Sequence, residues 1–234
     1  MNEFGELGML GVTVDGYGCP GLGYVSYGLI AREVERVDSS YRSAMSVQSS
    51  LVMHPINQFG TEEQKEKWLP KLATGEAIGT FALSEKSGRP TAAGLMTAVS
   101  DQKISGTKIP VADGAPADFA IVVAKSNAGD GASLYLVELD QDNVTIEAVR
   151  TLDFSRGHSR IEFEGAACEL LGKEGSGWSA AERLLDRAAV LYAWEQVGGA
   201  EAALNQAKEY AMGRYAFGRP IASYQAIKHK LAHM

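Results

Sequence analysis

Several features that mark whole classes of protein are scarce in this sequence. Only two of its 234 residues are cysteines, Cys19 and Cys168, and their wide separation fits no metal-ligand spacing. We therefore expect reduced thiols and a cytoplasmic location. The chain opens with neither a basic leader nor a long apolar run, so we expect no signal peptide and no membrane span.

Positive charge is also scarce. Lys and Arg total 22 against 29 Asp and Glu, which gives a formal net charge of −7. Proteins that bind nucleic acid need clustered basic residues to neutralise phosphates, so we expect no nucleic-acid partner. The chain does have 45% hydrophobic residues, enough for one large domain or two to three small ones. Small molecules or other protein chains are the expected partners.

The residue pattern changes twice along the chain. Residues 24–73 carry apolar side chains at helical spacing, and Thr61 opens a capping-box pattern for a helix expected to end near Pro70. Residues 77–171 hold short β-branched or aromatic runs separated by turn residues, which is typical of a small β domain. From Gly177 onward helix formers dominate. The sequence thus predicts an α+β fold.

We place the domain boundaries at these changes. The expected domains are a helical domain at 1–76, a middle β domain at 77–175, and further helices at 176–234.

One candidate binding site lies in the first third. If a single helix ran through residues 33–50, Glu35, Arg42 and Ser46 would share one face, because they are seven and four residues apart. An Arg beside a carboxylate and a hydroxyl can receive an anionic group through its guanidinium fork. The alternative is a solvated face with ordinary surface ion pairs, which spacing alone favours.

The end of the sequence carries the most specific motif. Residues 214–221, Arg-Tyr-Ala-Phe-Gly-Arg-Pro-Ile, predict the end of a helix, a tight turn and the start of a second helix. With Tyr224-Gln225 and Lys230-Leu231-Ala232-His233-Met234, they resemble the block that opens the carboxy-terminal helical domain of the flavin-dependent acyl-CoA dehydrogenases. The resemblance implies that family's fold, with a β-barrel or two-sheet middle domain. It also implies that most of the carboxy-terminal helical bundle is absent from this chain.

The same resemblance implies FAD as the cofactor. It assigns Arg214, Phe217, Ile221 and Gln225 to the pyrophosphate and adenosine of an FAD bound mostly by a neighbouring subunit. The chemistry is suitable, since Arg214 can pair with a diphosphate while Phe217 and Ile221 offer apolar surface to an adenine. The alternative is an amphipathic helical hairpin in which the Phe and Ile are simply core residues.

In the β region, residues 81–85, Phe-Ala-Leu-Ser-Glu, resemble the strand that runs beside the flavin ring, so Phe81, Leu83 and Ser84 are expected to contact it. The chain departs from the family at Pro110 and Ala112, where an aromatic and a hydroxyl residue usually pack against the ring. Because Ala112 offers no side-chain donor, we expect backbone groups to hold the ring.

The first third resembles one branch of the family, the glutaryl-CoA dehydrogenases. The likeness covers residues 33–55 and also Gly16-Tyr17-Gly18-Cys19 and Gly60-Thr61-Glu62-Glu63-Gln64. In that branch the positions of Glu35, Arg42 and Ser46 surround the distal carboxylate of the glutaryl group, which implies a dicarboxylyl-CoA pocket here. Beyond about Glu85 the sequence resembles a more generic branch, so a simple acyl substrate stays open.

The family removes a proton beside the thioester carbonyl while a hydride passes from the next carbon to the flavin. With glutaryl-CoA, decarboxylation to crotonyl-CoA follows. The proton acceptor is a carboxylate. In the family this Glu lies late in the carboxy-terminal domain or, in one branch, at the position of Ala188, so the resemblance implies no catalytic base in this chain.

The resemblance also implies partners: an acyl-CoA substrate, electron-transferring flavoprotein as electron acceptor, and a homo-oligomer or a heteromer. Two alternatives to a self-sufficient enzyme follow from the missing base. The chain could be a non-catalytic subunit of a heteromeric acyl-CoA dehydrogenase, or an inactive, incomplete polypeptide.

Overall fold

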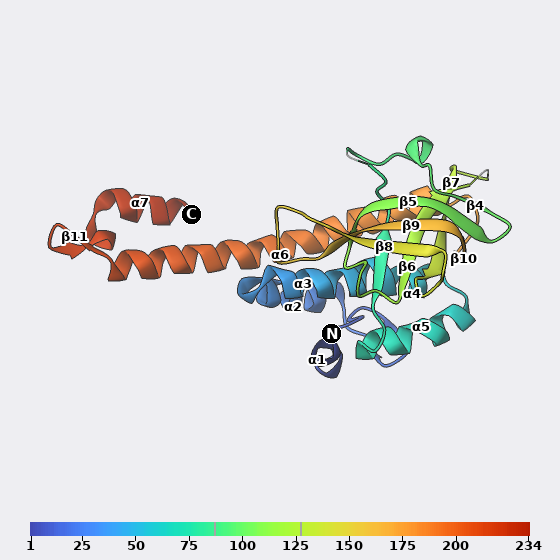
Figure 1. The fold of residues 1–234 in the computed structure, drawn as a ribbon. Helices are drawn as coiled ribbons and strands as arrows, with labels where there is room; N and C mark the ends of the chain where they lie inside the picture. Colours follow the sequence, from blue (N-terminus) through green and yellow to red (C-terminus); the bar gives the residue numbers. More distant parts are fainter. Residues whose placement is uncertain (87, 127) are drawn as a thin grey trace.

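The computed structural model describes residues 1–86, 88–126 and 128–234. Figure 1 shows a body made of helices and one sheet, with a long helix that leaves the body and carries a short helical hairpin at its far end. The helices are α1 (Asn2–Glu6), α2 (Tyr24–Val37), α3 (Ser39–Ser46), the π-helix η1 (Val47–Met53), α4 (His54–Phe59), α5 (Glu62–Thr74), α6 (Gly177–Gly213) and α7 (Gln225–His233), with 3-10 turns η2 (Ala92–Gly94) and η3 (Ile221–Ser223).

The predicted middle β region is present. Its strands are β3 (Gly79–Ala82), β4 (Ala98–Ser100), β5 (Lys103–Ala112), β6 (Phe119–Lys125), β7 (Ala132–Glu138), β8 (Val144–Val149), β9 (His158–Ala167) and β10 (Glu169–Leu171). Hydrogen bonds join all eight in one sheet of order β10-β7-β6-β4-β5-β9-β8, with β3 beside β6. The described strands are connected by hydrogen bonds into one sheet whose end strands, β10 and β8, do not pair. Strands β5, β6, β7 and β9 of this sheet enclose an apolar cluster without any helix, in keeping with the expected barrel-like or two-layer middle domain.

The strands with the longest apolar runs, β6 and β7, are neighbours in this sheet. In β6 every residue from Phe119 to Ala124 is buried, and β7 alongside it is buried from Ala132 to Val137. Two apolar clusters result. One lies between the sheet and the helices and includes Trp68 and Phe119, while the other includes Ile104 and Phe163. The α+β fold class is therefore confirmed, whereas the domain boundaries stay a prediction.

Helix α5 differs from expectation at its end. The capping box is present, because the Thr61 hydroxyl accepts from Gln64 N–H and the Gln64 side chain accepts from Thr61 N–H. The helix does not stop near Pro70, however, and continues to Thr74, where Gly75 in the left-handed region (φ 74°) ends it. Leu72 and Ala73 are buried in this last turn. Their burial compensates for the hydrogen bond that the proline ring removes.

The single helix through residues 33–50, which was the condition for the shared face, is broken at Asp38. The Asp38 backbone is extended, and its carboxylate accepts from the N–H groups of Ser40 (2.7 Å) and Tyr41 (3.0 Å). Asp38 therefore ends α2 and caps α3. From Ser39 the chain stays helical to Phe59, although its middle turn widens into η1. Such π segments are frequent at functional sites.

Helix η1 ties the helices to the sheet. The buried Gln48 amide donates to the carbonyls of Leu72 (3.2 Å) and Ala77 (2.8 Å), and its oxygen accepts from Gly79 N–H (3.1 Å). Since Gly79 begins β3, a single side chain fixes that strand against the helices.

Helix α6 is 37 residues long, or about 55 Å at 1.5 Å per residue. Its first turn is capped from the sheet, because the Asp130 carboxylate accepts from Ser179 N–H (2.8 Å). Further along, α6 lies against α2 so closely that Cβ atoms at Gly28 and Gly198 would collide with Trp194 and with the Arg32 carbonyl. We call the part beyond this crossing, residues 200–234, the arm (Figure 1).

At the end of the arm, β11 (Tyr215–Ala216) and β12 (Arg219–Pro220) form the predicted tight turn. Phe217 and Gly218 both have positive φ (53° and 78°), which suits a two-residue hairpin of type I′. None of the described helices combines the length and apolar character needed to cross a membrane.

Candidate functional site

The three residues predicted to form an anion receptor do lie together. Arg42 Nε donates to Glu35 Oε2 at 2.6 Å, so the pair meets across the break at Asp38. Glu35 also accepts from Ser39 Oγ at 2.6 Å. Ser46 lies one turn beyond Arg42 on α3. Only 11% of the Arg42 side chain and 14% of the Glu35 side chain are exposed, so this is a partly buried cluster and not a solvated helix face.

A fourth member of the cluster comes from α6. Glu195 Oε1 accepts from Ser46 Oγ at 2.6 Å, and Glu195 Oε2 lies 3.1 Å from Arg42 Nη1. That second contact is an ion pair by distance but is not aligned as a hydrogen bond, which leaves Oε2 buried without a hydrogen-bond partner. Burial raises the pKa of Glu195, against the lowering effects of the Ser46 hydrogen bond and the Arg42 charge.

Glu195 is not among the residues predicted for this site, although the sequence carries a signal for it. Leu184, Leu191 and Gly198 are buried at intervals of seven residues along α6. Glu195 falls in the same stripe, four residues after Leu191 and three before Gly198. A carboxylate in the middle of a buried helical stripe indicates a polar partner on the facing element. Here the partners are Ser46 and Arg42.

A small cavity of about 230 Å³ adjoins Arg42. Its lining residues come from α3, the end of β5, the β8–β9 loop, the start of β9 and α6, and they include Arg42, Ala112, Arg156, His158 and Tyr192. The cavity therefore connects the Arg42 cluster with Ala112, the position predicted to face the flavin edge.

The cavity wall is braced on two sides. Arg156 forms an ion pair with Asp113 and donates to the Ser40 carbonyl (3.2 Å), which links the β8–β9 loop to β5 and α3. On the opposite side Thr80 donates to the Ala112 carbonyl (2.6 Å), which links β5 to β3.

The predicted ring-contacting residues on and beside β3 lie on a rigid support. Phe81 and Leu83 are half-buried against the core, and the carbonyl of half-buried Ser84 accepts from Ile109 N–H (2.8 Å). Below them, the fully buried Lys108 donates to Glu85 (2.7 Å) and to the carbonyls of Leu83 (3.0 Å) and Val123 (2.6 Å). Burial lowers the pKa of Lys108 to about 8, against the opposing effect of Glu85.

The remaining predicted FAD contacts lie on the arm, far from β3. Phe217 is 97% exposed at the hairpin tip, and Arg214 and Gln225 are also exposed. Ile221 is half-buried. Figure 1 places β11 and α7 at the opposite end of α6 from the sheet. The structure thus separates the two predicted halves of the cofactor site by most of the length of α6.

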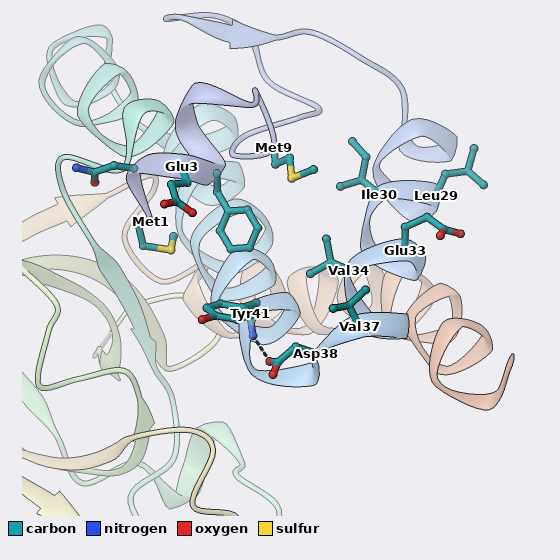
Figure 2. Close-up of a pocket in the computed structure, with 12 residues that line it drawn as sticks. Met1, Glu3, Met9, Leu29, Ile30, Glu33, Val34, Val37, Asp38 and Tyr41 are labelled. Carbon is teal, nitrogen blue, oxygen red and sulfur yellow. Dashed lines mark hydrogen bonds between the residues drawn. The ribbon is translucent and has the colours of Figure 1, made fainter. Parts of the chain in front are cut away.

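A larger cavity lies elsewhere on the described part of the chain. Figure 2 shows a groove of about 860 Å³ between α1 and the α2–α3 pair, faced by apolar side chains such as Met9, Ile30 and Val34. Glu33 and Asp38 lie at its edge, and Asp38 is occupied in capping α3. None of its twelve described lining residues is basic, so it offers no counter-charge to the phosphates of a nucleotide. The converging polar groups lie at the Arg42 cluster instead.

Models of one protein family match both ends of the chain. Residues 1–76 match the acyl-CoA dehydrogenase amino-terminal domain, and residues 175–234 match the acyl-CoA dehydrogenase carboxy-terminal domain. An acyl-CoA dehydrogenase of Bacillus subtilis is 35% identical over the whole chain, which covers 65% of that protein. The mitochondrial short-chain specific acyl-CoA dehydrogenase of Bos taurus is 34% identical, again over the whole chain and 60% of its own length.

A solved structure shows the same fold. The glutaryl-CoA dehydrogenase of Mycobacterium smegmatis in complex with FADH2 superposes with a TM-score of 0.91 at 36% identity, over 99% of this chain and 62% of that one. The present chain thus spans about 60–65% of the length of these relatives.

Proposed function

This chain belongs to the acyl-CoA dehydrogenase family, and from that premise we propose that it acts in the FAD-dependent α,β-dehydrogenation of an acyl-CoA thioester. One observation carries the proposal: a single cavity joins the Arg42 cluster to Ala112 and is braced against β3. An acyl chain whose far end reaches Arg42 would hold its thioester end towards β3 and β5. FAD, when bound, supplies the hydride acceptor.

The residues present fit each half of the cofactor. Phe81 and Leu83 offer apolar surface beside backbone amides, while Arg214 offers an exposed guanidinium for a diphosphate next to Phe217 for an adenine. Because one chain holds these halves at opposite ends of α6, we propose that the arm serves the FAD of a second chain. A homo-oligomer, or a heteromer with a related subunit, is then part of the function.

Two substrate classes remain as candidates. A short, uncharged acyl chain is supported by the short-chain relative and by the small volume of the cavity. Glutaryl-CoA, with decarboxylation to crotonyl-CoA, is supported by the presence of Glu35, Arg42 and Ser46 and by the glutaryl-CoA dehydrogenase structure. We propose the uncharged chain as the substrate, because the buried Glu195 carboxylate already contacts Ser46 and Arg42.

The base that removes the proton stays unassigned. Ala188 carries no carboxylate, and the nearby Glu182 accepts from Trp178 Nε1 (3.0 Å) while Asp186 is exposed. A catalytic carboxylate from another segment or chain is therefore part of the proposal. A non-catalytic subunit of a heteromeric enzyme is the alternative. We further propose electron-transferring flavoprotein as the electron acceptor. We also propose a cytoplasmic location, which the two unpaired cysteines favour.

The deciding experiment is the visible absorption spectrum of the purified chain, recorded before and after anaerobic addition of butyryl-CoA. Flavin absorbance that bleaches with substrate supports the dehydrogenase. Flavin that does not bleach in the chain alone shows that the catalytic carboxylate is not in this chain, and bleaching that appears only after a second chain is added supports the heteromeric enzyme. If neither the chain alone nor its mixture with FAD shows bound flavin, the proposed cofactor role is wrong.

A further inference from the structure

We propose that Glu195 fills the carboxylate receptor of this chain and so sets its substrate specificity against dicarboxylyl thioesters. The inference rests on the proposed function for its substrate and on the described contacts for its geometry. Ser46 and Arg42 hold Glu195 at 2.6 and 3.1 Å. A hydroxyl and a guanidinium at these distances are the groups that would hold the terminal carboxylate of a bound dicarboxylate.

Position and burial support this assignment. The Glu195 side chain is only 3% exposed, so it cannot leave the receptor for solvent without a shift of α6 against α2. That crossing is tight, since a Cβ at Gly198 would lie 2.1 Å from the Arg32 carbonyl. The crossing is further held by the Arg32–Glu201 ion pair (2.5 Å). The carboxylate is therefore a fixed part of the site.

Charge excludes a second carboxylate. The charged groups in direct contact with Arg42 are Glu35 from α2 and Glu195 from α6, while Arg156 in the wall of the adjoining cavity is paired with Asp113. With both acids ionised the cluster carries one excess negative charge, and with Glu195 protonated it is neutral. In the ionised state like charge opposes a second carboxylate, and in the protonated state the Glu195 carboxyl group still occupies the Ser46 hydroxyl and the space beside Arg42. A glutaryl terminus would meet like charge at close range, which is strongly unfavourable in a buried site.

The occupant that fits is an acyl chain with an uncharged end. Most residues that line the cavity beside Arg42 are polar, and Tyr192 and Ala112 are the two of its described lining residues that offer apolar surface to an acyl chain. The Tyr192 ring lies 5.6 Å from the Arg42 guanidinium carbon and covers it. The class of substrate that follows is a short acyl thioester with an uncharged end.

The first test measures binding without turnover. Dissociation constants for glutaryl-CoA and butyryl-CoA are measured by calorimetry on the wild-type chain, Glu195→Ala, Glu195→Gln and, as the matched control, Glu35→Gln. We expect Glu195→Ala to shift the glutaryl-to-butyryl ratio towards glutaryl by about tenfold or more, because it frees both the space and the donors. Glu195→Gln removes only the charge and should give a smaller shift. An equal shift in Glu35→Gln would show that net charge alone decides, and would overturn the assignment.

The second test needs no acyl-CoA. Sodium acetate, matched for ionic strength with sodium chloride, is added during thermal unfolding of wild type, Glu195→Ala and the double variant Arg42→Met/Glu195→Ala. Acetate should raise the unfolding temperature of Glu195→Ala by about 3 °C or more, and leave the other two unchanged, because a ligand of the vacated receptor stabilises the folded state. Equal effects on all three proteins would overturn the proposal.

The two tests separate the two claims. If acetate acts only on Glu195→Ala but no protein binds either thioester, the receptor stands and the proposed function fails. If both thioesters bind and Glu195→Ala leaves their ratio unchanged, the function stands and the inference is wrong. Should Glu195→Ala not fold, the ratio in Glu195→Gln decides, and an unchanged ratio there overturns the inference.

Discussion

The candidate functional residue on the body side of α6, Glu195, is buried, whereas most of those in the arm are exposed to solvent. At the body end, Leu184, Leu191 and Glu195 are buried, and the polar groups are held by hydrogen bonds from several elements. In the arm, Ala211 is the only buried residue of the described chain beyond position 200, while Phe217 stands almost fully in solvent. One helix thus joins a preorganised site to a surface that the body does not constrain. Substitutions should therefore change stability at one end and binding to a second chain at the other.

The sharpest contrast should come from a pair of lysines. Lys108→Met removes the ammonium group that pairs with buried Glu85 and donates to two backbone carbonyls. The substitution should lower the free energy of unfolding by about 3–5 kcal/mol. Lys228→Met on the exposed face of α7 should change it by less than about 0.5 kcal/mol. Urea unfolding of both variants measures the difference. Similar small losses would mean that Lys108 contributes little to the folded body.

A second pair tests the crossing between α2 and α6. Gly198→Ala places a Cβ against the Arg32 carbonyl and should cost about 1–3 kcal/mol, because backbone must move. The neighbouring Gly199→Ala meets only Glu35 side-chain atoms at 3.6 Å or more, and should gain up to about 1 kcal/mol from helix propensity. Unfolding midpoints of the two variants provide the measurement. If both stabilise, the helices cross less tightly than described.

The features that could be predicted from the sequence are those that depend on residues close together in the chain. The capping box at Thr61, the β runs, the long helix from Gly177 and the turn at Gly218 depend on local patterns, and all are present. The break at Asp38 was not predicted, because the helical spacing of apolar residues continues through it. The only local signal is the Asp38 side chain, which accepts from Ser40 N–H and caps α3. Glu195 was missed because its burial depends on α2 and α3, which lie about 150 residues earlier in the chain. Contacts between distant segments leave only a weak trace in one sequence.

Acid should destabilise the body through His54. Burial and the positive charge of Arg187 lower its pKa to about 4, from an ordinary value near 6.5. The unfolded chain therefore binds the proton more readily, so stability is complete above pH 6.5 and is lost as the pH falls towards 4. We expect His54 to account for about 1 kcal/mol of the loss between pH 7 and pH 5, after allowance for partial exposure. Urea midpoints of wild type and His54→Gln at the two pH values measure it, and parallel pH dependences would contradict it.

The smallest change in stability, but a clear change in binding, is expected in the arm. Arg214→Ala removes an exposed guanidinium and should leave the free energy of unfolding within about 0.5 kcal/mol of wild type. Its affinity for FAD should nevertheless fall about tenfold or more, because a charge-assisted contact to the diphosphate is lost. Flavin content after gel filtration, together with FAD titration, measures the effect.

Arg219→Ala is the matched control for this last prediction. Arg219 lies on the same hairpin, but its guanidinium stacks over the Tyr224 ring at 4.0 Å, so its loss should cost up to about 1 kcal/mol of hairpin stability and little FAD. The two arginines are thus expected to have different roles, Arg214 in binding and Arg219 in local structure. If both variants lose flavin equally, the hairpin acts through its shape, and the specific contact proposed for Arg214 is wrong. If neither loses flavin, the arm has no part in cofactor binding and Phe217 is exposed for another partner.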